Sequence, residues 1–193
     1  MSKHYRILLG TIALSALLLS GCAKGGTDAS AGSVSGSEAA GGASSVSEPS
    51  AAPITFEGTD LDGNAVTSDI FSQSKLTMVN VWATYCNPCL REMPGLGELA
   101  AEYDRSEFQI IGVVSDVTEG EDQTLVESLV QQTGAQYTHL LANDSIGQAI
   151  LSSVDAVPTT FFFDQEGAYL GGVVGSAEKS DWEDLIHELL EEQ

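Results

Sequence analysis

Two cysteines separated by two residues are the side chains in this sequence best suited to chemistry. Cys86 and Cys89 stand in the stretch Trp-Ala-Thr-Tyr-Cys-Asn-Pro-Cys, residues 82–89. A thiol attacks a disulfide only as the thiolate, and a free thiol with a pKa of about 8.5 is mostly protonated at neutral pH. The pair therefore needs an environment that activates one thiol.

The neighbouring sequence predicts such an environment at Cys86. Residues 76–82 form an apolar, β-branched run typical of a buried strand, and a helix is expected just past Cys86. The N–H groups and the dipole at a helix N-terminus favour a thiolate. Pro88 suits the first helical turn, where its missing N–H costs nothing. Cys89 lies one turn further in, so it can resolve a mixed disulfide.

Three other interpretations of the cysteine pair have weaker support. A zinc site would need two more ligands, and His139 and His187 are single and distant. A purely structural disulfide would add little stability, because the loop that it closes is very short. A one-cysteine peroxidase usually has Thr or Ser three residues before its cysteine, with a Pro ahead of it, and Ala83 stands there instead.

Hydrophobic patterns and turn residues predict the elements that must hold this pair. Strands are expected over residues 76–82, 108–114, 138–142, 160–163 and 169–174. Helices are expected from just past Cys86 to about residue 103, over 121–133 with Gly134 as the stop, over 145–151 and near the C-terminus. An N-terminal hairpin is expected over 54–67, around Asp62-Gly63. This order indicates an α/β fold with a mixed central sheet flanked by helices on both faces.

Two of the expected helices carry an apolar stripe. The stripes consist of Leu125, Val126, Leu129 and Val130 in one helix and of Trp182, Leu185, Ile186, Leu189 and Leu190 in the last one. Such spacing places the apolar side chains on one face of a helix. We interpret the C-terminal stripe as core packing, not as a partner site.

The first 21 residues have the pattern of a signal peptide. Lys3 and Arg6 precede an almost entirely apolar run over residues 7–19, which is too short to span a bilayer. The Leu-Ser-Gly-Cys that ends at Cys22 resembles the lipobox of bacterial lipoproteins, which implies cleavage before Cys22 and acylation of its thiol. The alternatives are an ordinary secreted protein with a stray cysteine and an uncleaved anchor.

The rest of the chain divides into a tether and a domain. Residues 22–53 contain the lipidated Cys22 and then mostly Gly, Ser and Ala without a hydrophobic period, so we expect a disordered tether. Residues 54–193 have the length of one domain. The expected location is the extracytoplasmic face of the cell membrane, where two or three acyl chains would hold the protein firmly.

The composition is strongly acidic. The 28 Asp and Glu residues outnumber 7 Lys and Arg residues, for a formal net charge of −21. This charge argues against binding to nucleic acid and against electrostatic docking on anionic lipid. The sequence has three cysteines. If Cys22 carries lipid, Cys86 and Cys89 are the two that remain as thiols. Outside the cytosol such a pair can persist as a disulfide.

Two segments resemble a known family. Val-Trp-Ala-Thr-Tyr-Cys-Asn-Pro-Cys-Leu-Arg-Glu-Met-Pro, residues 81–94, resembles the active-site region of the TlpA/ResA-type extracytoplasmic thioredoxin-like proteins. Ala-Val-Pro-Thr-Thr-Phe, residues 156–161, resembles their cis-proline loop and stands just before an expected strand. The resemblance covers the chain from about Ile54 to the C-terminus and implies a thioredoxin-like fold.

The resemblance also implies roles for single residues. Cys86 would be the nucleophile and Cys89 the resolving thiol, and the two would alternate between a dithiol and a disulfide. Pro158 would be cis and lie beside that disulfide, whereas an ordinary trans proline is the alternative. The residues expected to contact a substrate are Trp82, Tyr85, Pro88, Val157 and Pro158. For Trp82, core packing is an equal alternative.

Two polar positions near the cysteines concern proton transfer. Cytosolic thioredoxins have a buried Asp six residues before the first cysteine, and Asn80 occupies that position here. An amide cannot shuttle a proton. Glu92 matches an acidic residue that the family uses near its active site, so it is expected to modulate Cys89 or relay its proton. The alternative is a solvated helix carboxylate.

The resemblance implies an enzyme without a cofactor. It would reduce disulfides in exported proteins, with electrons from a membrane thiol carrier of the CcdA/DsbD type. Apocytochrome c and envelope methionine sulfoxide reductases are substrates within the family, and the same motif can also run as an oxidant. The second hypothesis is a Sco-type copper chaperone. That class has two cysteines separated by three residues and a late His, whereas His139 here lies in an expected strand.

Overall fold

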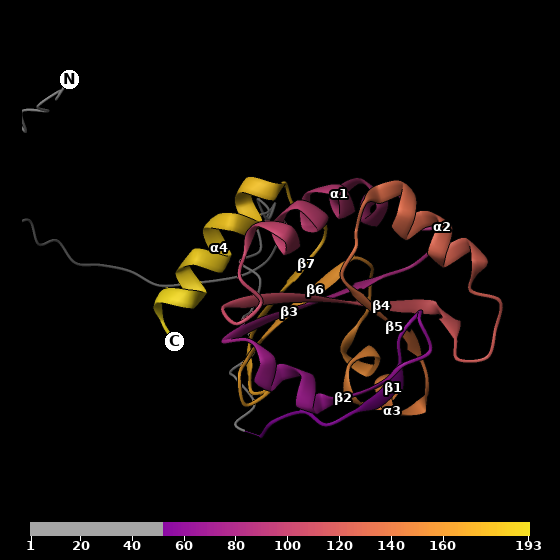
Figure 1. Cartoon of the computed structure of the whole chain (residues 1–193), viewed down its shortest axis with the longest axis horizontal. Helices are drawn as coiled ribbons and strands as arrows, with labels where there is room; N and C mark the ends of the chain where they lie inside the picture. Colours follow the sequence, from indigo (N-terminus) through magenta and orange to yellow (C-terminus); the bar gives the residue numbers. More distant parts are fainter. Residues whose placement is uncertain (1–51) are drawn as a thin grey trace, which may run out of the picture. The chain divides into compact units, whose positions relative to one another are not determined.

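The computed structural model describes residues 52–193, which form a central sheet with layers on both faces (Figure 1). The five strands have the order β5-β4-β3-β6-β7. They are β3 (Leu76–Trp82), β4 (Phe108–Thr118), β5 (Thr138–Ala142), β6 (Thr159–Asp164) and β7 (Tyr169–Val174). The β3, β4 and β5 strands are parallel, and β6 and β7 are antiparallel to their neighbours. The predicted mixed sheet is confirmed.

Helices cover both faces of this sheet, as predicted. Three helices, α1 (Asn87–Glu102), α2 (Thr124–Thr133) and α4 (Lys179–Glu191), lie on one face (Figure 1). The other face is covered by η1 (Ser68–Gln73), by α3 (Asp144–Ala149) with the short η2 (Leu151–Ser153), and by the hairpin of β1 (Glu57–Thr59) and β2 (Ala65–Thr67). The site is built on the α1 face.

Side-chain alternation along β3 decides what lies below α1. Val79 and Val81 pack in the core beneath η1 and α3, together with Phe71 and Ile146. Successive side chains of a strand point to opposite faces, so Asn80 and Trp82 point toward α1. The strand is buried along its whole length. Asn80 and Trp82 are therefore held against the helix that carries the cysteines.

The N-terminal hairpin protects one edge of the sheet. The β1 and β2 strands pair antiparallel, with Gly63 at a positive φ of 81° in the turn, as the Asp62-Gly63 pair predicts. A bridge between Asp60 and Leu140 then places the hairpin beside the outer strand β5. Covering an edge strand in this way removes a template for pairing with other chains.

Several boundaries differ from the predicted ones. The second helix begins at Thr124 rather than Glu121. Glu121 accepts a hydrogen bond from the Thr118 N–H and Asp122 accepts one from the Thr124 N–H, so both side chains stabilise the turn before the helix. Val126 and Val130 are buried, but Leu125 is 57% exposed, so its place in the core stripe is wrong. The η1 helix, which buries only Ile70 and Phe71, was not predicted.

The C-terminal stripe packs on the core as expected, with Trp182 and Ile186 buried. The signal peptide, Cys22 and nearly all of the tether fall in residues 1–51, outside the described residues. Within residues 52–193, the structure has no helix of the length and hydrophobicity that crossing a membrane requires.

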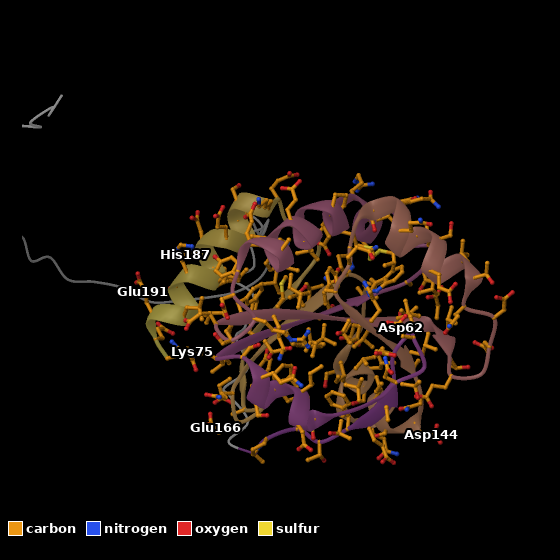
Figure 2. All side chains as sticks on the ribbon, in the orientation of Figure 1. Asp62, Lys75, Asp144, Glu166, His187 and Glu191 are labelled. Carbon is orange, nitrogen blue, oxygen red and sulfur yellow. A yellow bond between two sulfur atoms is a disulfide. The ribbon has the colours of Figure 1, made fainter. Side chains whose placement is uncertain are left out.

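Acidic side chains project from the domain around its whole outline (Figure 2). Two of its four basic residues are engaged in ion pairs with these carboxylates. Lys75 contacts Glu107 at 3.0 Å, and Lys179 contacts Glu98 and Glu102 at 3.1 and 2.6 Å. Exposed ion pairs contribute little to stability, about 0–1 kcal/mol each. The surface charge therefore bears on solubility and partners more than on the fold.

Candidate active site

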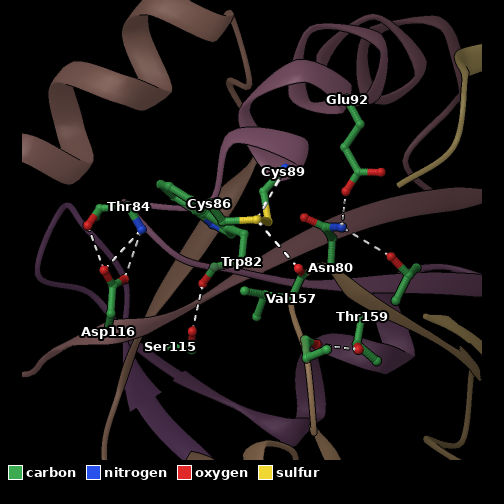
Figure 3. The surroundings of a disulfide bond; sticks show 12 residues. Asn80, Trp82, Thr84, Cys86, Cys89, Glu92, Ser115, Asp116, Val157 and Thr159 are labelled. Atoms are coloured by element: carbon green, nitrogen blue, oxygen red, sulfur yellow. Dashed lines mark hydrogen bonds between the residues drawn. A yellow bond between two sulfur atoms is a disulfide. The ribbon is translucent and has the colours of Figure 1, made fainter. Parts of the chain in front are cut away.

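The junction between β3 and α1 holds the cysteine pair. Cys86 is the N-cap residue of α1, and its Sγ accepts a hydrogen bond from the Cys89 N–H at 3.2 Å. The two residues form a disulfide with their Cα atoms 5.3 Å apart (Figure 3). Pro88 lies in the first helical turn, as predicted. The first turn of the helix thus points the Cys89 N–H group at the reacting sulfur.

The two sulfurs differ in accessibility. Both cysteines are largely buried, but Cys86 keeps 5% of its surface exposed and Cys89 keeps none. Cys86 is therefore the one closer to solvent. This asymmetry fits an attacking thiol at Cys86 and a resolving thiol at Cys89.

The second segment that resembles the family lies directly beside the disulfide. The Val157–Pro158 peptide bond is cis, as predicted. Cys86 Sγ lies 3.6 Å from the Val157 carbonyl oxygen (Figure 3). The Gly175 N–H donates to the Pro158 carbonyl at 2.8 Å, and the Thr159 hydroxyl donates to the Ala156 carbonyl at 2.7 Å. These bonds fix the loop against the reacting sulfur.

The two aromatic residues expected near the disulfide lie in different environments. Tyr85 is 73% exposed, which leaves its ring available to a bound polypeptide. Trp82 is 0% exposed and packs in the same core cluster as both cysteines. A fully buried indole cannot touch a substrate while the domain is folded as here, so the core-packing interpretation of Trp82 is the one that the structure favours.

Glu92 is buried, which makes its interpretation as a solvated helix carboxylate wrong. Only 7% of it is exposed, and its Oε1 accepts a hydrogen bond from Asn80 Nδ2 at 3.0 Å (Figure 3). Asn80 Nδ2 also donates to the Thr160 hydroxyl at 3.1 Å. Glu92 follows Cys89 by one helical turn, so both side chains face the sheet.

The surroundings of Glu92 shift its protonation. Burial raises the pKa of the carboxyl group, whereas hydrogen bonds from Asn80 and from the Ala177 N–H, and the nearby Trp182 indole, act in the opposite direction. Glu92 also borders a cleft of about 490 Å³ between α1 and the start of α4, beside Arg91 and Lys179. A carboxyl group with a raised pKa next to a solvent cleft is suited to proton exchange.

Sequence reasoning missed two contacts near the disulfide. It treated Asn80 only as the loss of an acid, but the amide holds Glu92 in place. It also missed Asp116, whose carboxylate accepts two hydrogen bonds from the Thr84 N–H at 3.0 Å and one from the Thr84 hydroxyl (Figure 3). The available signal was position, because Asp116 follows the strand predicted over residues 108–114, and the carboxyl ends of parallel neighbours such as β3 and β4 meet at the same edge of the sheet.

No metal site accompanies the cysteines within residues 52–193, where no three His, Cys, Asp or Glu side chains are grouped to hold an ion. Both ring nitrogens of His139 have partners, namely the Trp82 indole N–H and the Ala135 carbonyl. This imidazole is therefore not available as a copper ligand in the fold as it stands.

A thioredoxin-like sheet with a disulfide at the start of α1 and a cis-proline beside it defines a class of thiol–disulfide oxidoreductases. A family model described as the AhpC/TSA family matches residues 50–168, and the chain belongs to this family. It is 30% identical over 137 residues to the thiol-disulfide oxidoreductase ResA of Bacillus anthracis, covering 69% of this chain and 74% of that protein. The ResA of Bacillus subtilis is 30% identical over 152 residues, or 77% of each chain.

Solved structures agree with the fold. A thiol:disulfide interchange protein of Chlorobium tepidum superposes with a TM-score of 0.62 at 24% identity, covering 72% of this chain and 94% of that one. The pneumococcal exposed lipoprotein thioredoxin of Streptococcus pneumoniae superposes with a TM-score of 0.55 at 25% identity, covering 69% and 98%. The protein is thus an enzyme of the thiol–disulfide oxidoreductase class, and proteins with disulfides are its class of substrate.

Proposed function

We propose that this oxidoreductase is anchored to the cell membrane through Cys22, faces outward, and reduces disulfides in exported proteins. The observation that carries the proposal is the unequal placement of the pair, with Cys86 at the start of α1 keeping 5% of its surface exposed and Cys89 fully buried behind it. A reductase needs this order of events, because the substrate must meet one thiol while the second waits inside.

The first step is attack by the Cys86 thiolate on one sulfur of a substrate disulfide. A new bond forms between Cys86 and the substrate, and the other substrate sulfur leaves as a thiolate that takes up a proton. The N–H of Cys89, which donates to Cys86 Sγ in the disulfide form, remains in place to stabilise the thiolate before attack.

In the second step Cys89 loses its proton and attacks Cys86 Sγ. The Cys86–Cys89 disulfide forms, the second substrate sulfur leaves, and two electrons have passed to the substrate. We assign the proton of Cys89 to Glu92, whose pKa is raised by burial and which faces the sheet from the next turn of α1. Asn80 keeps the carboxylate oriented during this exchange.

The substrate is proposed to lie as an extended chain across the loop of Val157 and Pro158. The Val157 carbonyl faces Cys86, so a main chain that pairs with this loop brings its own sulfur to the reacting atom. Tyr85, which is exposed beside the disulfide, offers an apolar surface together with the partly buried Pro88 and Val157. Main-chain pairing gives affinity without a strict sequence requirement.

The membrane anchor and the electron donor rest on the N-terminal sequence and on the relatives. The Cys22 pattern indicates lipidation, and one structural neighbour is itself described as an exposed lipoprotein thioredoxin. We propose a membrane thiol carrier of the CcdA/DsbD type as the donor that returns the disulfide to the dithiol. Apocytochrome c and envelope methionine sulfoxide reductases are the proposed classes of substrate protein.

The reduction potential of the Cys86–Cys89 couple tests the proposed direction. We expect equilibration with glutathione buffers to give a potential in the range of thioredoxin, about −270 mV, and steady reduction of insulin in the presence of dithiothreitol. A potential near that of a strong oxidase, about −120 mV, would contradict the reductase assignment. The matched control is the Cys86→Ser/Cys89→Ser protein, which should not reduce insulin above background.

A further inference from the structure

A histidine is buried inside the sheet next to the redox site. His139 lies on β5, is 2% exposed, and pairs in register with Gly112 on the neighbouring strand β4. A Cβ atom at position 112 would lie 2.1 Å from His139 Nδ1. Glycine in a strand interior weakens the strand and often marks the close approach of another group. Here the glycine makes room for the imidazole.

Both nitrogens of this imidazole are used. The Trp82 indole N–H donates to His139 Nδ1 at 3.2 Å, and His139 Nε2 lies 2.9 Å from the Ala135 carbonyl oxygen. Because Nδ1 accepts, the proton must be on Nε2, where it donates to Ala135. The ring is therefore neutral and has no hydrogen bond left to make. Burial agrees with this state, since it lowers the pKa of His139 to about 4.

Aromatic contacts fix the same group from two sides. The Tyr137 ring stacks on His139 with centroids 4.5 Å apart and planes at 30°. The Trp82 ring meets His139 edge-on, with centroids 5.6 Å apart and planes at 77°. The acceptor of the Trp82 N–H is therefore a ring that is itself held in place by its neighbours.

We propose that His139 is a positioning residue of the redox site, which holds the Trp82 indole in one orientation beneath the Cys86–Cys89 pair through a hydrogen bond to the indole N–H. Trp82 belongs to the same buried cluster as both cysteines, and Figure 3 shows it next to the disulfide. His139 itself does not touch the sulfurs, so it acts only through Trp82.

The positioning role of His139 follows from the change in the Cys86–Cys89 bond during the reaction. The sulfurs of Cys86 and Cys89 are bonded in one state and separated in the other, while the Trp82 indole is part of the buried cluster that packs around them. An indole whose orientation is fixed keeps Cys89 aligned for attack on Cys86 in the second step, because a misplacement of about 1 Å slows such a reaction. The benefit of this orientation for reducing proteins rests on the proposed function. The hydrogen bond between Trp82 and His139 does not.

Two substitutions separate the hydrogen bond from simple packing. In His139→Asn, the amide oxygen takes about the position of Nδ1 and can still accept from Trp82, but the bond to Ala135 is lost. In His139→Gln, the amide nitrogen takes about the position of Nε2 and can still donate to Ala135, but the acceptor for Trp82 is lost. Both variants replace the imidazole ring with an amide and so lose part of its packing. A difference between the two variants therefore reports on the hydrogen bonds rather than on the lost packing.

The measurement uses the full-length chain with 15N-labelled tryptophan. We expect the Trp82 indole N–H resonance to keep its position in His139→Asn and to move upfield in His139→Gln, with the Trp182 resonance as an internal reference. The rate at which the reduced protein forms its disulfide with oxidised glutathione should fall about fivefold in His139→Gln and stay within about twofold in His139→Asn, since one hydrogen bond contributes about 1 kcal/mol.

The inference is overturned if the two variants slow the reaction equally, or if the Trp82 resonance stays in place in His139→Gln. Insulin reduction by the wild-type protein is measured in parallel. A wild-type protein that reacts with glutathione but leaves insulin intact would contradict the proposed function, whereas the comparison of the two variants would still decide the role of His139.

Discussion

Cys86 and Cys89 share one disulfide but lie in different surroundings, and this difference gives a direct test at the residue scale. The Cys89→Ser variant keeps the accessible thiol and lacks the resolving one, so it should accumulate a mixed disulfide with a substrate protein. The Cys86→Ser variant keeps only the buried thiol, which a protein cannot reach. Non-reducing electrophoresis and mass spectrometry measure the adduct. Equal trapping by both variants would contradict the assignment.

Glu92 gives a second prediction at this scale, on stability against pH. Burial raises its pKa, so the folded protein binds this proton more tightly than the unfolded chain does. The stability of the wild type therefore falls as the pH rises from the ordinary carboxyl range through the raised pKa, and it is regained below both. Because Glu92→Gln does not titrate, its free energy of unfolding relative to the wild type should rise over the same pH window.

Urea unfolding of the oxidised proteins between about pH 4 and about pH 8 measures this difference. The matched control is Glu98→Gln, which removes an exposed carboxylate from the same helix. A difference between Glu92→Gln and the wild type that is constant with pH would show that the Glu92 carboxyl titrates alike in the folded and unfolded states. In the reduced proteins, Glu92→Gln should also change the titration of Cys89, and an unchanged Cys89 pKa would exclude the proposed proton transfer.

At the scale of elements, β4 and β5 pack tightly where Gly112 lies opposite His139. In Gly112→Ala the new Cβ would collide with His139, so we expect a loss of about 1–3 kcal/mol in the free energy of unfolding. Gly147 in α3 serves as the control, because a Cβ atom added there would meet nothing within 4 Å. Gly147→Ala should be neutral or stabilising by up to about 1 kcal/mol. Equal effects in denaturant unfolding would contradict the close packing.

The link between β4 and the loop before Cys86 gives another test at this scale. Asp116→Ala removes every acceptor for Thr84, whereas Thr84→Val removes only the hydroxyl and keeps the backbone N–H bonds. We expect Asp116→Ala to slow insulin reduction more than Thr84→Val and to cost about 1 kcal/mol of stability. The reverse order of the two rates would show that Asp116 does not support the loop through its backbone contacts.

The elements differ in how far the sequence predicts them. The strand before Cys86, the helix after it and the cis Pro158 follow from local patterns, because apolar runs, turn residues and a motif lie within a few positions of one another. The short η1 helix has only two buried residues and therefore no period to detect. Asn80 and Glu92 are twelve residues apart, and only the packing of α1 on β3 brings them together.

At the scale of the whole molecule, the proposed lipid anchor at Cys22 gives a prediction about location. The net charge of −21 gives no attraction to anionic lipid, so lipid at Cys22 would supply the membrane affinity. We expect Cys22→Ser to move the protein from the membrane fraction to the soluble fraction, with insulin reduction by the domain unchanged. Fractionation with immunoblotting measures this. A variant that stays with the membrane would point to an uncleaved anchor.

The tight fit of His139 against Gly112 also limits the order in which these two positions can change during evolution. A side chain at position 112 leaves too little room for an imidazole at position 139, because its first carbon would lie 2.1 Å from Nδ1. The order with the smaller cost is therefore glycine first and histidine second. Once histidine is in place, a change at position 112 alone carries the stability cost predicted above for Gly112→Ala.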